Sequence, residues 1–133
     1  MRVLGIDPGL TRCGVAVVDG TPGTTLTALY VGVIRTDPQA PVEQRLTEVE
    51  AGLSALVAEF GPDAIAIERV FSQHNVRSAM ATAQAAAMGL LIAGQRGIPV
   101  ALHTPTEVKA AVTGSGRAEK AQVTAMVTRI LRL

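Results

Sequence analysis

Aromatic side chains are scarce in this sequence. Its 133 residues include no tryptophan, one tyrosine and two phenylalanines. Because 48% of the residues are nevertheless hydrophobic, alanine, valine, leucine and isoleucine must build the core. A chain of this length suits a single domain, and we expect residues 1–133 to form it.

Cysteine is nearly absent as well. The single cysteine, Cys13, excludes an intramolecular disulfide and fits a reducing cytosol. We expect Cys13 to be a buried strand residue, because free cysteine behaves as a small hydrophobic side chain.

Long hydrophobic runs are also missing. No apolar stretch reaches the roughly 18 residues that a membrane helix needs. The longest candidate, residues 79–93, is rich in alanine and contains Gln84. The N-terminus lacks the charged and then apolar layout of a signal peptide. We therefore expect a cytoplasmic protein without a membrane partner.

The net charge of +1 favours no class of partner by itself. Its distribution is more informative. Residues 1–68 carry four arginines and nine acidic residues, a net of −5. Residues 69–133 carry eight basic and two acidic residues, a net of +6. This asymmetry indicates an acidic and a basic part with different roles, although charges can also cluster by chance on solvated faces.

Hydrophobic periodicity predicts an α/β fold with a mixed sheet flanked by helices. Apolar and β-branched runs predict five strands, at residues 2–7, 13–19, 25–36, 63–68 and 98–102. Spacings of three and four residues predict helices at 42–60, at 76–96, from Thr104 and at 118–133. The second and third strands should form an antiparallel hairpin with the first beside them, and the later helix–strand alternation favours a mixed sheet.

Two carboxylates follow buried runs directly. Asp7 follows VLGI and Glu68 follows AIAI. If these strands are parallel neighbours, both side chains reach one spot, where ligands of α/β sheets gather. Two such carboxylates would favour a hard cation such as Mg²⁺, and its natural chemistry is phosphodiester hydrolysis. Acidic residues at strand ends also serve as turn formers or helix caps, so position alone leaves both interpretations open.

Three segments carry a family resemblance. VLGIDPGLTRCGVAVVD, AIAIERVF and VKAAVTGSGRAEKAQV, in this order, resemble the RuvC family of Holliday-junction resolvases, over residues 2–133. The resemblance implies a ribonuclease H-like fold and a crossover junction endodeoxyribonuclease. It also implies a homodimer that makes paired nicks in four-way DNA junctions during recombination and repair. The expected cofactor is Mg²⁺, two ions per active site with Mn²⁺ as a substitute, and the expected partner machine is RuvA–RuvB.

The resemblance also assigns roles to individual residues. Asp7 and Glu68 match the first and second catalytic, metal-binding carboxylates. Phe71 matches an aromatic residue near the junction core. Lys109 and Lys120 match lysines that the family uses in DNA contact or catalysis, and Lys120 is the one we expect to be catalytic. The family closes its site with acidic or histidine residues on a final helix, which this sequence lacks; as given, the chain is expected to miss part of its metal site.

The remaining basic and aromatic candidates lie near these motifs. Arg69 and Arg77 flank the Phe71 loop and could contact phosphates, or be ordinary surface arginines. Backbone N–H groups of residues 114–116, between Lys109 and Lys120, could bind an anion. His74 and His103 are weaker candidates. His74 lies in the loop with Phe71 and could touch DNA, and His103 ends the fifth strand and could approach the metal site, but capping or surface roles are favoured for both.

The alanine-rich second helix could pack against its own sheet or form a two-fold dimer interface. Its small residues are Ala79, Ala83, Ala86, Ala87 and Gly94.

Three other functions compete with the resolvase. GIDPGLT resembles the phosphate-binding turn of actin-like ATPases and sugar kinases, but those proteins need a second domain and an adenosine site. A YqgF-type nuclease acting on RNA has a similar opening motif, but GSGRAEKAQV and ERVF argue against it. A non-catalytic junction-binding module is the third, and a nicking assay separates it from the enzyme.

Overall fold

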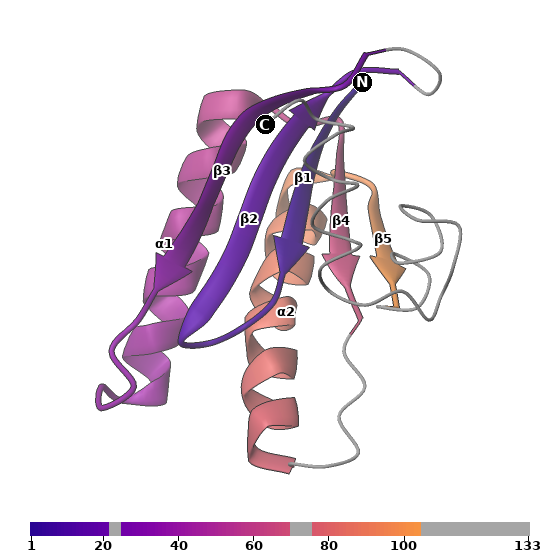
Figure 1. Ribbon diagram of the computed structural model, residues 1–133. Coiled ribbons are helices and arrows are strands. Elements are labelled where there is room, and N and C mark those ends of the chain that lie inside the picture. Colours follow the sequence, from indigo (N-terminus) through magenta and orange to yellow (C-terminus); the bar gives the residue numbers. More distant parts are fainter. Residues whose placement is uncertain (22–24, 70–75, 105–133) are drawn as a thin grey trace.

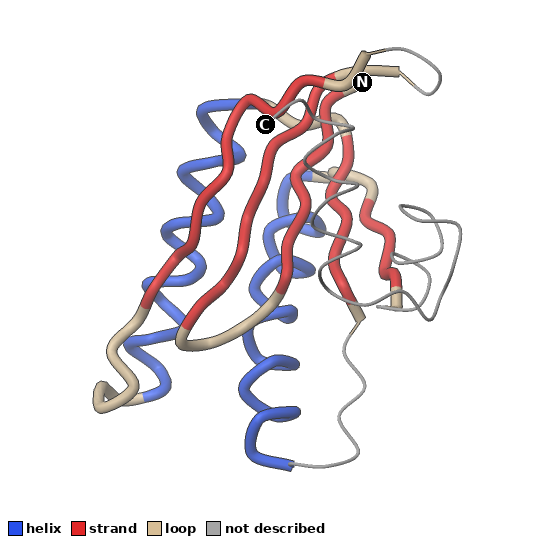
Figure 2. Tube along the Cα trace, in the orientation of Figure 1, coloured by secondary structure: helices blue, strands red, loops and turns tan. Residues whose placement is uncertain are grey.

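Five strands and two helices make up residues 1–21, 25–69 and 76–104, which a computed structural model describes (Figures 1 and 2). In chain order they are β1 (Arg2–Asp7), β2 (Arg12–Asp19), β3 (Thr27–Arg35), α1 (Val42–Phe60), β4 (Ala64–Glu68), α2 (Val76–Arg96) and β5 (Val100–His103). The expected helix from Thr104, the glycine loop at 114–116 and the helix at 118–133 fall on residues beyond those described.

The sheet has the order β3-β2-β1-β4-β5. β1 pairs antiparallel with β2, and β2 with β3, as the predicted hairpin required. β1 and β4 are parallel neighbours, and β5 lies parallel to β4 at the edge. The predicted mixed five-stranded sheet flanked by helices is therefore confirmed.

The boundaries of four strands differ from the predicted ones by one or two residues, and the end of α2 explains the late start of β5. The fifth strand was expected from Ile98 to Leu102, but β5 runs from Val100 to His103. The Ile98 N–H donates to the Ala93 carbonyl, and Gly97 has a φ of 63°. Ile98 therefore closes the last turn of α2 and is not free to start a strand.

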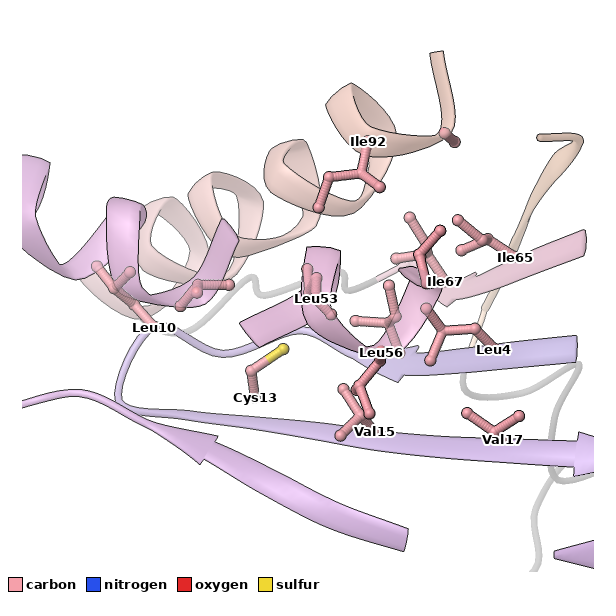
Figure 3. Close-up of a cluster of buried hydrophobic side chains, with 14 residues drawn as sticks. Leu4, Leu10, Cys13, Val15, Val17, Leu53, Leu56, Ile65, Ile67 and Ile92 are labelled. Carbon is pink, nitrogen blue, oxygen red and sulfur yellow. The ribbon is translucent and has the colours of Figure 1, made fainter. Parts of the chain in front are cut away.

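Both helices cover the same face of the sheet (Figure 1). Because side chains alternate along a strand, every second residue of the central strands points toward the helices. These residues form the core with apolar residues of α1 and α2, as Figure 3 shows. The buried members are Leu4, Ile6, Leu10, Cys13, Val15, Val17, Val49, Leu53, Leu56, Val57, Ile65, Ile67, Ile92 and Ala93.

The helix ends agree with the sequence signals. α1 begins after Pro41 and ends at Gly61, which has a left-handed backbone with a φ of 54° and donates its N–H to the Val57 carbonyl.

A glycine in α2 allows this helix to pack closely on the sheet. A Cβ added at Gly89 would lie 2.9 Å from Ile67 Cδ1 and 3.0 Å from Ile6 Cδ1. Glycine there lets α2 approach the two strands that carry the candidate carboxylates.

Cys13 is fully buried in the core, as expected. Burial raises the pKa of its thiol, and the negative charge of Asp7 raises this pKa further, against a lowering by a backbone hydrogen bond at Gly9. A raised pKa keeps the thiol protonated at neutral pH, and a protonated thiol is a poor nucleophile. Cys13 is therefore a packing residue, although it lies beside the candidate site.

The expectation that no apolar stretch reaches the roughly 18 residues of a membrane helix was wrong for α2, which has 21 residues. Among the described residues, Val76–Arg96 is one helix long and apolar enough to cross a membrane by length and composition alone. Its many alanines raise the average hydropathy despite Gln84. Helices of water-soluble proteins pass the same test, and α2 contributes Ala85, Ile92 and Ala93 to the buried residues of the sheet–helix layer.

Candidate active site

Asp7 and Glu68 lie at the carboxyl ends of two adjacent parallel strands. Ile6 is paired with Ile67 in the β1–β4 ladder, and the two acids follow these residues directly. Since Ile6 and Ile67 face the helices, Asp7 and Glu68 both face the opposite side of the sheet. The parallel arrangement on which the predicted juxtaposition depended is therefore present.

Gly14 on β2 leaves space beside Asp7. The two residues are partners in the β1–β2 ladder. A Cβ at Gly14 would lie 3.3 Å from Asp7 Cβ and 3.8 Å from its Oδ2. A larger residue would therefore press on the carboxylate, and glycine keeps that side of Asp7 accessible.

A cavity of about 570 Å³ opens over this end of the sheet. Asp7, Glu68 and His103 line it together, and Glu68 and His103 are partners in the β4–β5 ladder. Small residues from four strands make up much of its wall: Gly5, Gly14, Ala16, Gly32 and Ala66. Three titratable side chains therefore line the cavity, and the glycine and alanine residues around them leave space beside these groups.

His103 was a weak candidate in the sequence analysis, and its distance from the two carboxylates depends on the register of β5 against β4. β5 ends one residue later than predicted, at His103, which brings this histidine level with Glu68. The Arg69 N–H donates to the His103 carbonyl, so the β4–β5 ladder continues to the site.

The turn between β1 and β2 is fixed by close packing at Gly9. A Cβ at Gly9 would overlap the carbonyl oxygen of Arg12. Only glycine therefore fits this turn without a backbone shift. Since Asp7 ends the strand two residues earlier, the geometry of the turn also sets the position of the carboxylate.

A hydrogen-bond network then ties this turn to β3 and α1. Thr36 donates its hydroxyl to the Leu10 carbonyl at 2.6 Å and its N–H to the Thr11 carbonyl at 3.1 Å. Arg45 donates from Nε to Thr36 Oγ1 and from Nη2 to Thr11 Oγ1, each at 2.8 Å.

Sequence analysis missed Arg45. A signal did exist, because Arg45, Val49 and Leu53 are spaced by four residues on one stripe of α1. A charged residue in an otherwise buried stripe indicates a polar contact within the fold.

The other predicted site residues are divided between described and undescribed parts of the chain. Arg69 is exposed directly after β4, and Arg77 is exposed in the first turn of α2. Four more candidates fall outside the described residues: Phe71, His74, Lys109 and Lys120.

The two carboxylates fit a divalent cation. Asp7 is exposed, and no ion pair of Asp7 with a lysine or arginine is found within the described ranges. Over those same residues, no group of three or more His, Cys, Asp or Glu side chains is close enough to hold a metal. His103 lines the same cavity as the two carboxylates. Among the described residues, Asp7 and Glu68 are the carboxylates that could hold such a cation, because they end adjacent parallel strands.

Comparison with known proteins decides the family. The family model described as "Crossover junction endodeoxyribonuclease RuvC" matches residues 3–133. The chain belongs to the RuvC family. It is 64% identical over 133 residues to the RuvC of Streptomyces avermitilis and 65% identical to that of Streptomyces griseus. All of this chain is matched, and it spans 76% and 65% of the lengths of these two relatives.

A solved structure agrees with the sequence match. Thermus thermophilus RuvC, in complex with Holliday junction substrate, superposes with a TM-score of 0.93 at 34% identity. The superposition covers 100% of this chain and 81% of that one. The ribonuclease H-like fold expected from the sequence is therefore confirmed.

Proposed function

We propose that this chain forms the nuclease domain of a metal-dependent endonuclease that resolves four-way DNA junctions by paired, symmetric nicks. One observation carries the proposal: in a RuvC-family chain, Asp7 and Glu68 sit side by side at the ends of parallel β1 and β4. The family's nucleases are metal-dependent, and two relatives with at least 64% identity are crossover junction endodeoxyribonucleases by name. Residues 1–133 would act as one domain in this role.

Asp7 and Glu68 would hold Mg²⁺ in this enzyme. Mg²⁺ takes six oxygen ligands, so water, DNA phosphate oxygens and groups beyond the described residues would complete its shell. When bound, two such ions stabilise the attacking and leaving oxygens of a phosphodiester displacement, and Mn²⁺ would substitute. The chain's own contribution is to fix both carboxylates on adjacent strands and to keep the floor beside them open with Gly14.

Basic residues near the site would bind the DNA backbone. Arg69 follows Glu68 directly, and Arg77 is the second residue of α2. Figure 1 shows that α2 begins at the end of the sheet where β1 and β4 finish. We assign both to phosphate contacts, which position DNA without selecting sequence. Lys109 and Lys120 belong to the same proposal through the family resemblance, with Lys120 acting in catalysis.

A homodimer would bring two such sites to one junction. α2 exposes a stripe of apolar and small residues at helical spacing: Val76, Met80, Ala83, Ala87 and Leu91. Ala86 belongs to the other side, since it packs against the core cluster. A two-fold axis matches the symmetry of a four-way junction. RuvA–RuvB as partner and a cytoplasmic location are parts of this proposal.

The first test compares binding to a four-way junction with binding to linear duplex of the same sequence. We expect preference for the junction and a strong salt dependence, because phosphate contacts release counterions. About six contacts would lower affinity by on the order of 10³ between roughly 50 and 200 mM salt. A slope of log K on log salt near zero, or equal affinity for both DNAs, would contradict a junction-specific enzyme. Nicking in Mg²⁺ separates the enzyme from a junction-binding module.

Phe71 is expected to prop open the junction centre, although its position lies outside the described residues. It is one of two phenylalanines, in the polar segment ERVFSQHNVRS, three residues after Glu68. A stacked aromatic offsets the cost of unstacking a base step. Phe71→Ala should lose about 1–3 kcal/mol of stacking, measured as slower cleavage of an intact junction.

A flexible junction, already open at its centre, serves as the control for Phe71→Ala and should be cut almost normally. Thermal unfolding supplies the second control, because truncating a core phenylalanine costs about 3–5 kcal/mol of folding stability. A stable Phe71→Ala protein that cuts both junctions at the parent rate would rule out the wedge.

A further inference from the structure

His103 is a titratable side chain of the carboxylate cavity to which the proposed function gives no role. It lines this cavity together with Asp7 and Glu68. The three residues end β5, β1 and β4, which are parallel neighbours in the order β1-β4-β5 (Figure 1). Glu68 therefore lies in the middle of the row, between the other carboxylate and the histidine.

The backbone of β5 holds His103 level with Glu68. The two residues are partners in the parallel β4–β5 ladder, and the Arg69 N–H donates to the His103 carbonyl one step further on. The pairing thus continues past both residues, so neither lies at a frayed strand end. Neighbouring strands are about 4.8 Å apart, and paired residues point to the same face of the sheet. The imidazole therefore lies next to the Glu68 side chain on the face opposite the helices.

Glu68 is the carboxylate of the pair that needs a side-chain partner more. A glutamate side chain has one more rotatable bond than an aspartate side chain, so more freedom is lost when its carboxylate is held in one position. On the β1 side Glu68 has Asp7 as its neighbour, and an ionised carboxylate only accepts hydrogen bonds. A donor for Glu68 must therefore come from another direction.

His103 supplies that donor. Its imidazole carries at least one N–H whether it is neutral or protonated. Among the described residues that line the cavity, His103 has the one side chain that donates a hydrogen bond, since the others are carboxylates, glycines and apolar residues. Arg69, the next residue after Glu68, lines a different cavity beside Leu102.

We propose that His103 is a positioning residue, which donates an imidazole N–H to Glu68 and so directs the Glu68 carboxylate toward the metal ion. The inference rests on the proposed function and adds a residue to the same site. A hydrogen bond to one carboxylate oxygen restricts the rotation of the side chain and leaves the second oxygen for the cation. The neutral imidazole is sufficient for this role, so no proton transfer by His103 is required.

Metal binding by the full-length protein without DNA tests this role separately from nicking. Titration calorimetry measures the affinity for Mn²⁺, the proposed substitute for Mg²⁺. His103→Ala should weaken Mn²⁺ binding by about 10- to 100-fold, the usual effect of removing a group that orients a metal ligand. Unchanged Mn²⁺ affinity of His103→Ala would overturn the proposal.

Val100→Ala is the matched control for His103→Ala. Val100 is an exposed residue of the same strand, and its ladder partner is the core residue Ile65, so it lies on the helix-covered face. Truncation there should leave Mn²⁺ affinity unchanged. Thermal unfolding in EDTA checks that both variants are folded. An equal loss of Mn²⁺ affinity in both variants would mean that His103 only supports the edge strand, and would overturn the proposal.

His103→Asn and His103→Gln test whether the hydrogen bond itself is what matters. The asparagine amide takes the place of ring atom Nδ1 and the glutamine amide that of Nε2, and both donate without ionising. One of the two variants should recover most of the Mn²⁺ affinity that His103→Ala loses. Recovery by neither would mean that the imidazole acts in another way, for example as a metal ligand itself, and would overturn the positioning role.

Junction binding in EDTA separates a DNA contact from the positioning role. His103→Ala should bind a four-way junction as tightly as the parent does when no metal is present. Weaker junction binding with normal Mn²⁺ affinity would assign His103 to the DNA backbone and overturn the proposal.

Glu68→Gln distinguishes the failure of this inference from that of the proposed function. If Glu68→Gln loses Mn²⁺ affinity and His103→Ala does not, the positioning role alone is overturned. If Glu68→Gln binds Mn²⁺ as tightly as the parent, the metal site of the proposed function is overturned as well.

Discussion

Asp7→Asn is expected to abolish nicking while junction binding is retained. The asparagine keeps the size of the side chain but removes the negative charge that a Mg²⁺ ligand supplies. Loss of a group that merely orients a metal ligand costs about 10- to 100-fold, so loss of the ligand itself should exceed that. Binding should persist, because it depends on basic residues elsewhere. Nicking is measured at saturating Mg²⁺, and binding by titration of the same junction.

Asp63→Asn is the matched control for Asp7→Asn. Asp63 lies at the opposite end of the sheet, where its carboxylate accepts the Arg2 N–H at 2.8 Å. An asparagine can still accept this bond, and the site should be unaffected. Glu68→Gln should behave like Asp7→Asn. Full nicking activity of the Asp7 variant in saturating Mg²⁺ would contradict its role as a ligand.

The carboxylate pair could be predicted because its determinants are local. A buried run that ends on an acid can be found in sequence, and the helix between β3 and β4 indicates that a later strand returns to the sheet. Pro41 and Gly61 defined α1 for the same reason, since both act through the backbone of neighbouring residues. The juxtaposition of Asp7 and Glu68 needed one further assumption, that β1 and β4 are parallel neighbours, and the pairing supports it.

Arg45 could not be placed from sequence because its partners are remote. It bonds to Thr36, 9 residues away, and to Thr11, 34 residues away. Periodicity identifies the stripe of α1 that faces the sheet, but not which loop closes over its first turn. His103 was expected at the end of the fifth strand, from where it could approach the metal site, but its alignment with Glu68 depended on the register of β5 against β4. Sequence thus located the elements that hold the candidate residues, and packing between distant segments determined the surroundings of those residues.

Gly9→Ala is expected to leave a folded protein with strongly reduced nicking. The added methyl group would overlap the Arg12 carbonyl oxygen, which is backbone and cannot rotate away as a side chain could. The turn must then shift, together with the Leu10 and Thr11 carbonyls that bond to Thr36. Overpacking of this kind costs about 1–3 kcal/mol of folding stability.

The functional loss from Gly9→Ala should exceed the loss in stability. Since Asp7 is two residues from Gly9, a shift of about 1 Å moves the carboxylate relative to Glu68, and such a displacement costs on the order of 100-fold in rate. Gly94→Ala is the stability control: no described atom lies within 4 Å of the added carbon, and alanine should raise the unfolding free energy by about 1 kcal/mol in this helix. A folded Gly9→Ala protein that nicks junctions at the parent rate would show that the turn does not position Asp7.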